Sequence, residues 1–278
     1  MPNLAIQAHA QEINAVAKFQ TDLHNLLALL GKEDVQVVAP GTAFTIHKAS
    51  GTLSNAEVAE KALIPDSNIS IDNGTVVEIT FKKYRNLVPI EKIAKIGYDS
   101  AVGGANASMI KQAQARVRST IIAATNATGV GTATAANFKA KLAKGAAYVA
   151  KKFEDEVFTP IHFVNTDDAY DYIGSADITV QNAFGITYLE NFMGLGTVIL
   201  DSNITAGTIF STACENLDVV AADITKIDGM ELTTDESGLI GVHVAPAYSN
   251  GAIETVAFCG VQALPVFADR VCKVTTAA

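Results

Sequence analysis

The chain has 278 residues and a net charge of −9; 49% of its residues are hydrophobic and only 18% are charged. This composition excludes an intrinsically disordered chain, because such chains combine few hydrophobic residues with a high net charge. The apolar surplus predicts that part of it is buried between subunits, since obligate interfaces resemble a domain core.

The charge is distributed unevenly along the chain. Residues 100–153 contain eight basic residues and no acidic one, a net charge of +8, whereas residues 154–278 contain eighteen acidic and three basic residues, a net charge of −15. This asymmetry predicts two surfaces that meet different partners, one of them polyanionic. Two solvated helix faces are the alternative interpretation.

The sequence gives three indications of cellular location. The longest uncharged run, residues 119–138, is too rich in Thr, Asn and Gly for a transmembrane helix. The first residues lack the basic and apolar regions of a signal peptide, so we expect synthesis in the cytoplasm and no membrane contact. Cys214, Cys259 and Cys272 are odd in number and lack metal-ligand spacing, which predicts reduced, buried thiols.

The first third of the chain predicts a helix followed by a long flap. Residues 1–30 carry apolar residues at helical spacing and end before Gly31, and we expect this helix to pack on a neighbour, within the chain or in another subunit. Residues 35–48 and 76–82 are predicted strands. The polar, turn-rich segment between them, residues 49–75, predicts a two-stranded flap that must lie on something else to be stable.

The remaining residues alternate irregularly between helix and strand patterns. A long helix is predicted from Asp99 or Ser100 to about Asn126, and a second helix over 135–153. A short helix over 165–174 is predicted to be capped by Asn165 or Thr166. Further strands are expected at 158–164, 197–200, 208–211, 238–244, 252–264 and 270–274. This mixed order predicts an α+β fold.

Motifs for catalysis are incomplete. The glycine pairs at 129–131 and 194–196 lack the third glycine and the βαβ context of a dinucleotide site. The paired carboxylates Asp167 and Asp168 begin a predicted helix, where negative charge complements the helix dipole. The five histidines have no carboxylate or cysteine at ligand spacing. We therefore expect no cofactor, no metal and no enzyme, with a soluble oligomeric enzyme as the remote alternative.

Three segments in the same order resemble one protein family. They are NAEVAEKALIPDSN (55–68) with the strand and turn that follow it, FVNTDDA (163–169) and GLGTVILDSNI (194–204). They are similar to the AEG-x-x-IP-x-S loop, the V-x-N-P helix cap and the G-x-P-V strand of tailed-phage major capsid proteins of the Hong Kong 97 type. Lys61 stands where that family usually has glycine, and Thr166 where it usually has proline.

This resemblance implies a layout and an assembly. The implied layout is an N-terminal arm (1–34), an extended loop (35–88), a peripheral domain (89–154 and 227–265) with a long spine helix, and an axial domain (155–226 and 266–278). The family forms hexamers and pentamers of an icosahedral phage head around double-stranded DNA. A separate scaffolding protein and a portal are the implied partners, and an encapsulin-type compartment is the alternative shell.

Two groups of residues are expected to act in assembly. The loop residues expected between subunits are Glu57, Glu60, Lys61, Ile64 and Pro65. A basic face on the two longer predicted helices is expected to look toward the shell interior, where it meets DNA or an acidic scaffold weakly and non-specifically, while residues 154–236 face outward. That face is expected to consist of Lys111, Arg118, Lys141 and Lys144, and charge reversal at Lys141 and Lys144 is expected to spare the fold.

Overall fold

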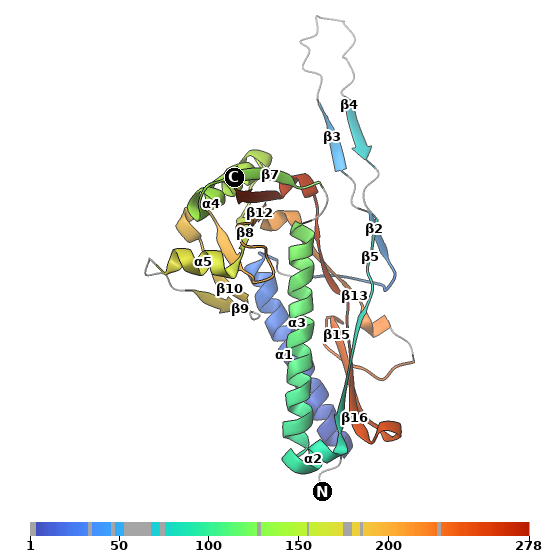
Figure 1. The fold of residues 1–278 in the computed structure, drawn as a ribbon. Helices are drawn as coiled ribbons and strands as arrows, with labels where there is room; N and C mark the ends of the chain where they lie inside the picture. The colour runs from blue at the N-terminus through green and yellow to red at the C-terminus, as the bar shows by residue number, and fades with distance from the viewer. Residues whose placement is uncertain are drawn as a thin grey trace, which may run out of the picture.

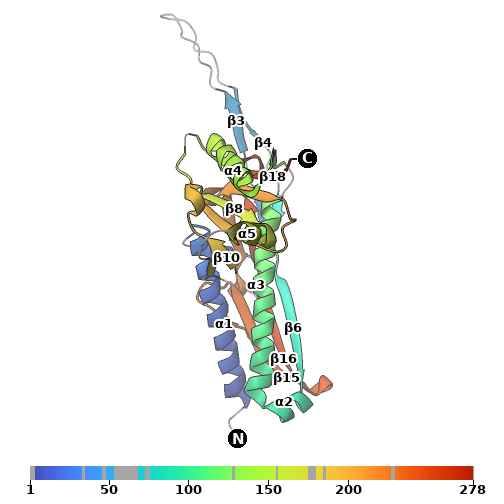
Figure 2. The ribbon, with the colours of Figure 1, turned by 60° about the vertical axis from the view of Figure 1, so that its left-hand side comes forward.

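The computed structural model describes residues 4–32, 35–45, 48–52, 68–72, 76–126, 129–154, 156–174, 180–183, 186–226 and 229–277. The molecule is elongated, with two long helices along its lower part, a large sheet at its upper end and a thin ribbon that rises beyond the body (Figures 1 and 2). The helices are α1 (Leu4–Leu29), α2 (Ile90–Ile96), α3 (Gly104–Thr125), α4 (Phe138–Lys152) and α5 (Thr166–Ile173). Helices and sheets are segregated as the predicted α+β class requires, and that prediction is confirmed.

A four-stranded antiparallel sheet forms the lower body. Its strand order is β14 (Thr233–Thr234), β15 (Ile240–Ala247), β16 (Ala252–Cys259) and β6 (Lys82–Pro89). Both long helices pack on this part of the molecule, α1 against β15 and α3 against α1 and β6. The core between them contains Phe19 and Leu23 of α1 and Ile110 of α3, each at most 1% exposed. The 3.6-residue period of these apolar positions is what fixes the buried face of each helix.

A seven-stranded mixed sheet forms the upper body. Its order is β7 (Gly131–Ala135), β18 (Cys272–Thr276), β12 (Ile209–Ala213), β8 (Pro160–Val164), β11 (Thr197–Leu200), β10 (Ile186–Leu189) and β9 (Gln181–Ala183). The pairs β7–β18 and β8–β11 are parallel, and the other neighbours are antiparallel. Helix α4 packs across β12, β18 and β7, and Leu142 of α4 is fully buried against this sheet.

Smaller sheets connect the body with the ribbon. The strand β1 (Gln36–Val38) pairs in parallel with β13 (Leu217–Ala222), which pairs with β17 (Val261–Pro265). The ribbon consists of two antiparallel pairs, β2 (Ala43–Thr45) with β5 (Val76–Glu78), and β3 (Lys48–Thr52) with β4 (Asn68–Asp72). The predicted flap is therefore present as strands, although residues 53–67 lie outside the described part of the chain.

Helix termini follow the predicted signals at two places. Gly31 has φ +67°, its N–H donates to the Ala28 carbonyl and the next N–H, of Lys32, donates to the Leu27 carbonyl, which is a Schellman motif. The Asn165 side chain accepts from the N–H groups of Asp167 and Asp168 and caps α5. Both predicted helix ends are confirmed.

The start of the long helix differs from the prediction. Neither Asp99 nor Ser100 caps α3, because the chain is already helical at Tyr98 (φ −61°, ψ −53°) and continues through a π-helical turn, Asp99–Gly103, into α3. Glycine at 103 and 104 weakens the first regular turn and accommodates the wider one.

The structure bears on three parts of the predicted layout. Residues 4–30 pack within the chain, which is one of the two placements expected for the arm, because their apolar face is buried there. Residues 82–88, placed in the extended loop, form most of β6 in the four-stranded sheet. Residues 131–152, placed in the peripheral domain, contribute β7 and α4 to the seven-stranded sheet because α4 buries its apolar face there. The rest of the division stays a prediction.

Candidate assembly surfaces

The flap is anchored to the body by one buried residue. Ile79 is fully buried against Val220 and Ala222 of β13. Its carbonyl accepts from the Gly41 N–H and its N–H donates to the Thr42 carbonyl, both at 3.1 Å. Beyond this anchor, β3 and β4 stand away from the body (Figure 1). The strand predicted over residues 76–82 is present only as β5 up to Glu78, because the chain leaves the ribbon there, and Ile79 stands at the base of the flap.

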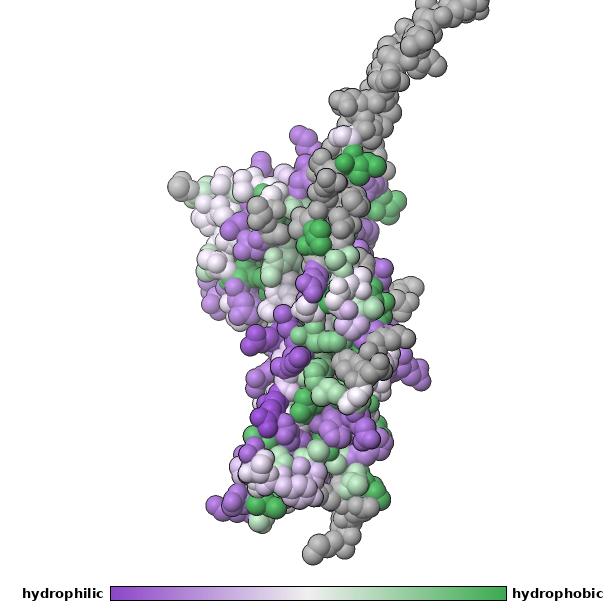
Figure 3. All heavy atoms as spheres, turned by 90° about the vertical axis from the view of Figure 1, so that its right-hand side faces the viewer, coloured by the Kyte–Doolittle hydropathy of each residue, from purple (hydrophilic) through white to green (hydrophobic). Residues whose placement is uncertain are grey.

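The flap carries exposed apolar side chains. Ile71 is 70% exposed and Val76 is 62% exposed. A second group lies at the opposite end of the molecule, where Ile90 of α2 and Tyr248 after β15 are 59% and 89% exposed. Hydrophobic residues lie at separate places among polar ones on the face shown in Figure 3. Exposed apolar side chains of this kind are candidates for contact with another molecule.

The five predicted loop residues, Glu57, Glu60, Lys61, Ile64 and Pro65, lie outside the described residues. Their role between subunits stays a prediction.

The structure separates the four predicted residues of the basic face. Lys111 and Lys144 are exposed, on α3 and α4. Lys141 is only 5% exposed, and its Nζ donates to the Gly207 carbonyl at 3.0 Å and lies 3.4 Å from the Thr276 Oγ1. The prediction that Lys141 contributes to an exposed basic face is therefore wrong, because its ammonium group is used inside the protomer.

Arg118 is half-buried between α3 and the seven-stranded sheet. It lines a small cavity with Leu26 and Phe163, and Asp201 is close enough to interact with it electrostatically. Burial lowers the pKa of the Arg118 guanidinium from its usual value, and Asp201 opposes this shift. Arg118 therefore interacts within the protomer and is less available to a partner than Lys111 and Lys144.

Glu12 of α1 forms a buried polar cluster that no sequence motif indicated. The residue is 6% exposed. Its two carboxylate oxygens accept hydrogen bonds from the Val244 N–H and the Thr233 hydroxyl, both at 2.6 Å. The Nδ1 atoms of His9 and His243 lie 3.1 and 3.4 Å from these oxygens. This cluster ties the first half of α1 to β14 and β15.

His162 and Ser211 form a second buried polar group. The His162 Nδ1 lies 2.7 Å from the Ser211 Oγ, and its Nε2 lies 3.0 Å from the Leu195 carbonyl. A carbonyl only accepts, so Nε2 carries the proton of the neutral ring and Nδ1 accepts from the serine. Both side chains are fully buried, and burial lowers the pKa of His162. His162 is thus a core histidine with both ring nitrogens hydrogen-bonded inside the protein.

The cysteines are buried as predicted. Burial raises the pKa of Cys214 to about 12 and the pKa values of Cys259 and Cys272 to about 11. Such thiols are inert at neutral pH because the thiolate is the reactive form. Within the described residues, no group of three His, Cys, Asp or Glu side chains is arranged to hold a metal ion.

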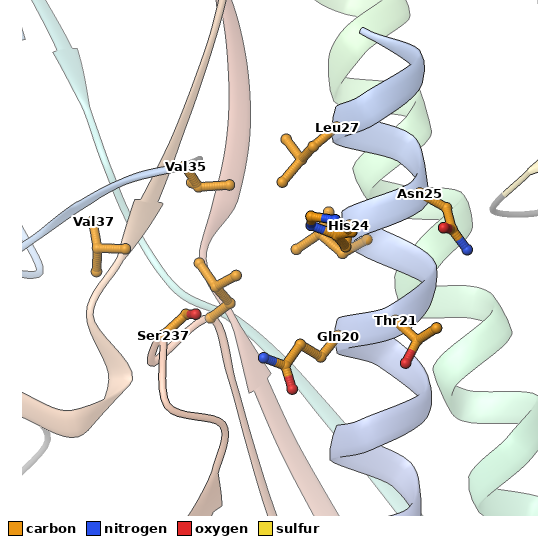
Figure 4. Close-up of a pocket in the computed structure, with 10 residues that line it drawn as sticks. Gln20, Thr21, His24, Asn25, Leu27, Val35, Val37 and Ser237 are labelled. Atoms are coloured by element: carbon orange, nitrogen blue, oxygen red, sulfur yellow. The ribbon is translucent and has the colours of Figure 1, made fainter. Parts of the chain in front are cut away.

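A groove of about 690 Å³ separates α1 from the chain that leads to the flap. Gln20, His24 and Leu27 of α1 point across it toward Val35 and Val37 of that segment, with Ser237 on the same side (Figure 4). The groove thus lies between α1 and β1, at the point where the chain leaves the body toward the flap.

No protein-family model and no curated protein sequence matches the chain. Solved structures match it over most of its length. A capsid of an empty GTA particle has a TM-score of 0.58 at 12% identity, with 88% of each chain covered. A solved structure of Gordonia phage Cozz has a TM-score of 0.56 at 11% identity, covering 91% of this chain and 87% of that one. The chain has the Hong Kong 97-type capsid fold.

Two further solved structures also match the chain. The virus-like particle of Pyrococcus furiosus has a TM-score of 0.53 at 12% identity, covering 95% of this chain and 96% of that one. An encapsulin complex of Synechococcus elongatus has a TM-score of 0.51 at 8% identity, covering 87% and 84%. The Hong Kong 97-type fold is therefore shared here by phage capsids and an encapsulin.

Among the described residues, no helix is both long and apolar enough to span a membrane.

Proposed function

We propose that this chain is the major capsid protein of a tailed phage, assembling as hexamers and pentamers into an icosahedral head around double-stranded DNA. The observation that carries the proposal is the flap, which leaves the body at Ile79 and presents exposed Ile71 and Val76. A two-stranded ribbon is marginally stable alone. Contact with a neighbouring subunit would bury these side chains and stabilise the ribbon by mass action.

Removal of the flap tests this function. Replacing residues 49–75 with an Asn-Gly turn should leave the protomer folded, because the anchor at Ile79 and the sheets of the body remain. Assembly into shells should be lost. Sedimentation and electron microscopy measure assembly, and circular dichroism measures the fold. Shells of normal stability from the deletion variant would contradict the proposal.

A milder variant addresses the same contact. Ile71→Asp adds one charge to an exposed apolar position of the flap without shortening it. The unfolding temperature of the protomer should stay unchanged because the side chain is 70% exposed there. Assembly should weaken, since the charge would be buried unpaired in the subunit interface.

The expected partners follow from the same proposal. A separate scaffolding protein and a portal direct assembly, the packaged DNA is contacted weakly, and the mature protein resides in the virion capsid after synthesis in the host cytoplasm. Lys111 and Lys144, with Arg118 as a half-buried neighbour, face the interior, while residues 154–236 face outward. Each phosphate neutralised by such a lysine should add about 0.9 to the salt slope of DNA binding.

An encapsulin-type compartment is the second candidate, because the solved structures with this fold include an encapsulin. The two candidates differ in content. Purified shells should protect double-stranded DNA from nuclease if the chain is a phage capsid protein, and should contain a protein cargo without DNA if it is a compartment. The absorbance ratio of purified particles and gel analysis of their contents decide between them.

A further inference from the structure

The outermost strand of the four-stranded sheet, β6, has a free edge. It pairs with β16 on one side, and no strand of the described residues pairs with its other side. Figure 2 shows β6 at the rim of the sheet, beside α3. Free strand edges are templates for pairing with another chain unless they are protected.

The register shows which backbone groups of β6 are unpaired. The Ile90 N–H donates to the Gly251 carbonyl at 3.0 Å, and β6 continues this register from Pro89 opposite Ala252 to Lys82 opposite Cys259. In an antiparallel pair, residues alternate between facing the partner strand and facing away. The N–H and C=O groups of Lys83, Arg85 and Leu87 therefore point toward the free edge.

The free edge opens into a groove rather than onto a flat surface. A groove of about 640 Å³ runs between β6 and the first half of α3. The α3 side is formed largely by small residues, including Gly104, Ala105 and Ser108, which leave room beside the strand. Cavities of this size are typical of sites that hold a ligand or a short peptide.

The groove is basic. Lys83 and Lys92 line it, and no carboxylate does. Arg85 also lines it but is held by Glu254 in a two-point ion pair, with the Nη2–Oε2 contact at 3.2 Å.

We propose that this groove binds an extended acidic segment of a different polypeptide, which adds as a strand to the free edge of β6 and places carboxylates beside Lys83 and Lys92. Backbone hydrogen bonds provide affinity in strand addition, and side-chain pockets provide specificity. The inference goes beyond shell formation, because it assigns a binding site on the protomer.

Two observations favour such a segment over other occupants. A phosphate backbone only accepts hydrogen bonds from the groove, so it would leave the outward carbonyl oxygens of β6 unpaired, whereas a strand pairs with both donors and acceptors. A second copy of β6 is a poor occupant, because Lys82, Lys83 and Arg85 of the two copies would repel each other. The occupant that fits both observations is acidic and extended and comes from another chain.

Peptide binding to the purified protomer tests the proposal. The probe is a fluorescein-labelled nine-residue peptide of alternating Glu and Val, measured by fluorescence anisotropy at low ionic strength. Binding should be lost when alternate amides of the peptide are N-methylated, because strand pairing is then blocked while the charge is unchanged. The amides of Lys83, Arg85 and Leu87 should exchange more slowly with solvent when the peptide is bound.

Matched variants separate this groove from general electrostatic attraction. Lys83→Glu with Lys92→Glu should weaken binding about tenfold or more, whereas Lys18→Glu with Lys151→Glu, exposed on α1 and α4 outside the groove, should leave it unchanged. Circular dichroism confirms that each double variant is folded. Equal binding of the N-methylated peptide would overturn the proposal, as would tighter binding of a twelve-base-pair duplex that depends on the same lysines. If the protein self-associates without peptide, and Lys83→Glu with Lys92→Glu abolishes that self-association, then a second copy occupies the groove. This result would also overturn the proposal.

Discussion

Removing the Glu12 carboxylate should detach the first half of α1 from the sheet. In Glu12→Ala the Val244 N–H and the Thr233 hydroxyl lose their acceptor, and each bond to a charged acceptor contributes about 1.5–3 kcal/mol. Water enters from the adjacent groove, which exposes part of this cluster, and offsets some of the loss. We expect the free energy of unfolding to fall by about 2–4 kcal/mol.

The chemistry of the cluster predicts an order among variants. Glu12→Gln keeps one acceptor oxygen and the packing, so it should cost about half as much as Glu12→Ala. His9→Ala should cost less than about 1 kcal/mol, because the histidine side chain is 64% exposed and its pairing with Glu12 is screened. Glu91→Ala, an exposed glutamate of α2, serves as the control and should change little.

Urea unfolding followed by circular dichroism measures these differences. With a urea dependence of about 3 kcal/mol per molar, the midpoint of Glu12→Ala should fall by about 1 M. Limited proteolysis should cut α1 faster in this variant, since local opening precedes cleavage. A midpoint for Glu12→Ala equal to that of Glu91→Ala would refute the conclusion that this carboxylate holds α1.

Three further predictions concern the upper body. Lys141→Glu should destabilise the protomer by about 3–5 kcal/mol, because its site is buried. Lys144→Glu, at an exposed position, should change stability by less than about 0.5 kcal/mol. Equal unfolding temperatures of the two variants would contradict the contacts of Lys141. Burial lowers the pKa of His162 in the folded chain, so as the pH falls this imidazole is protonated in the unfolded chain before it is protonated in the folded chain. The free energy of unfolding should therefore fall as the pH drops below about 6.5, by at most about 1.4 kcal/mol per pH unit. Urea midpoints from pH 7.5 to 5 measure this, and an unchanged slope in His162→Asn would exclude this residue as the cause. Gly145→Ala should destabilise the fold by about 1–3 kcal/mol, because its Cβ overlaps a side chain of β12. Gly104→Ala, at a helical glycine with open space around it, should be neutral or stabilising by up to about 1 kcal/mol. Thermal unfolding distinguishes the two variants, and equal effects would contradict the close approach of α4 to β12.

Local signals in the sequence were sufficient for much of the fold. The apolar period of residues 1–30 and Gly31 specify α1 and its end, because helix periodicity and the left-handed position depend on neighbouring residues only. The same is true of Asn165 at the start of α5. The start of α3 could not be predicted in this way, since both Asp99 and Ser100 are good caps and the preceding helical turn decides between capping and continuation.

The candidate sites depend on contacts that no local pattern contains. Lys141 is followed four residues later by Gly145, whose missing side chain allows α4 to approach β12 closely, and the carbonyl that accepts from Lys141 comes from Gly207. Glu12 is 231 residues from His243 in the sequence and meets it only because α1 packs on β15. Charge counts along the chain therefore predicted a basic region without showing which lysines the fold uses internally.

The free edge of β6 and the flap pose the same physical problem for an isolated protomer. Both present backbone groups that a partner must pair, and an unprotected edge of this kind promotes aggregation. Lys82, Lys83 and Arg85 in β6, with Pro89 at its end, are the residue types that block pairing between identical edges, because like charges repel and proline lacks the N–H. Repulsion between two copies becomes attraction toward an acidic strand. In the proposed binding mode, the residues that oppose pairing between identical edges thus also select the charge of the chain that completes the sheet.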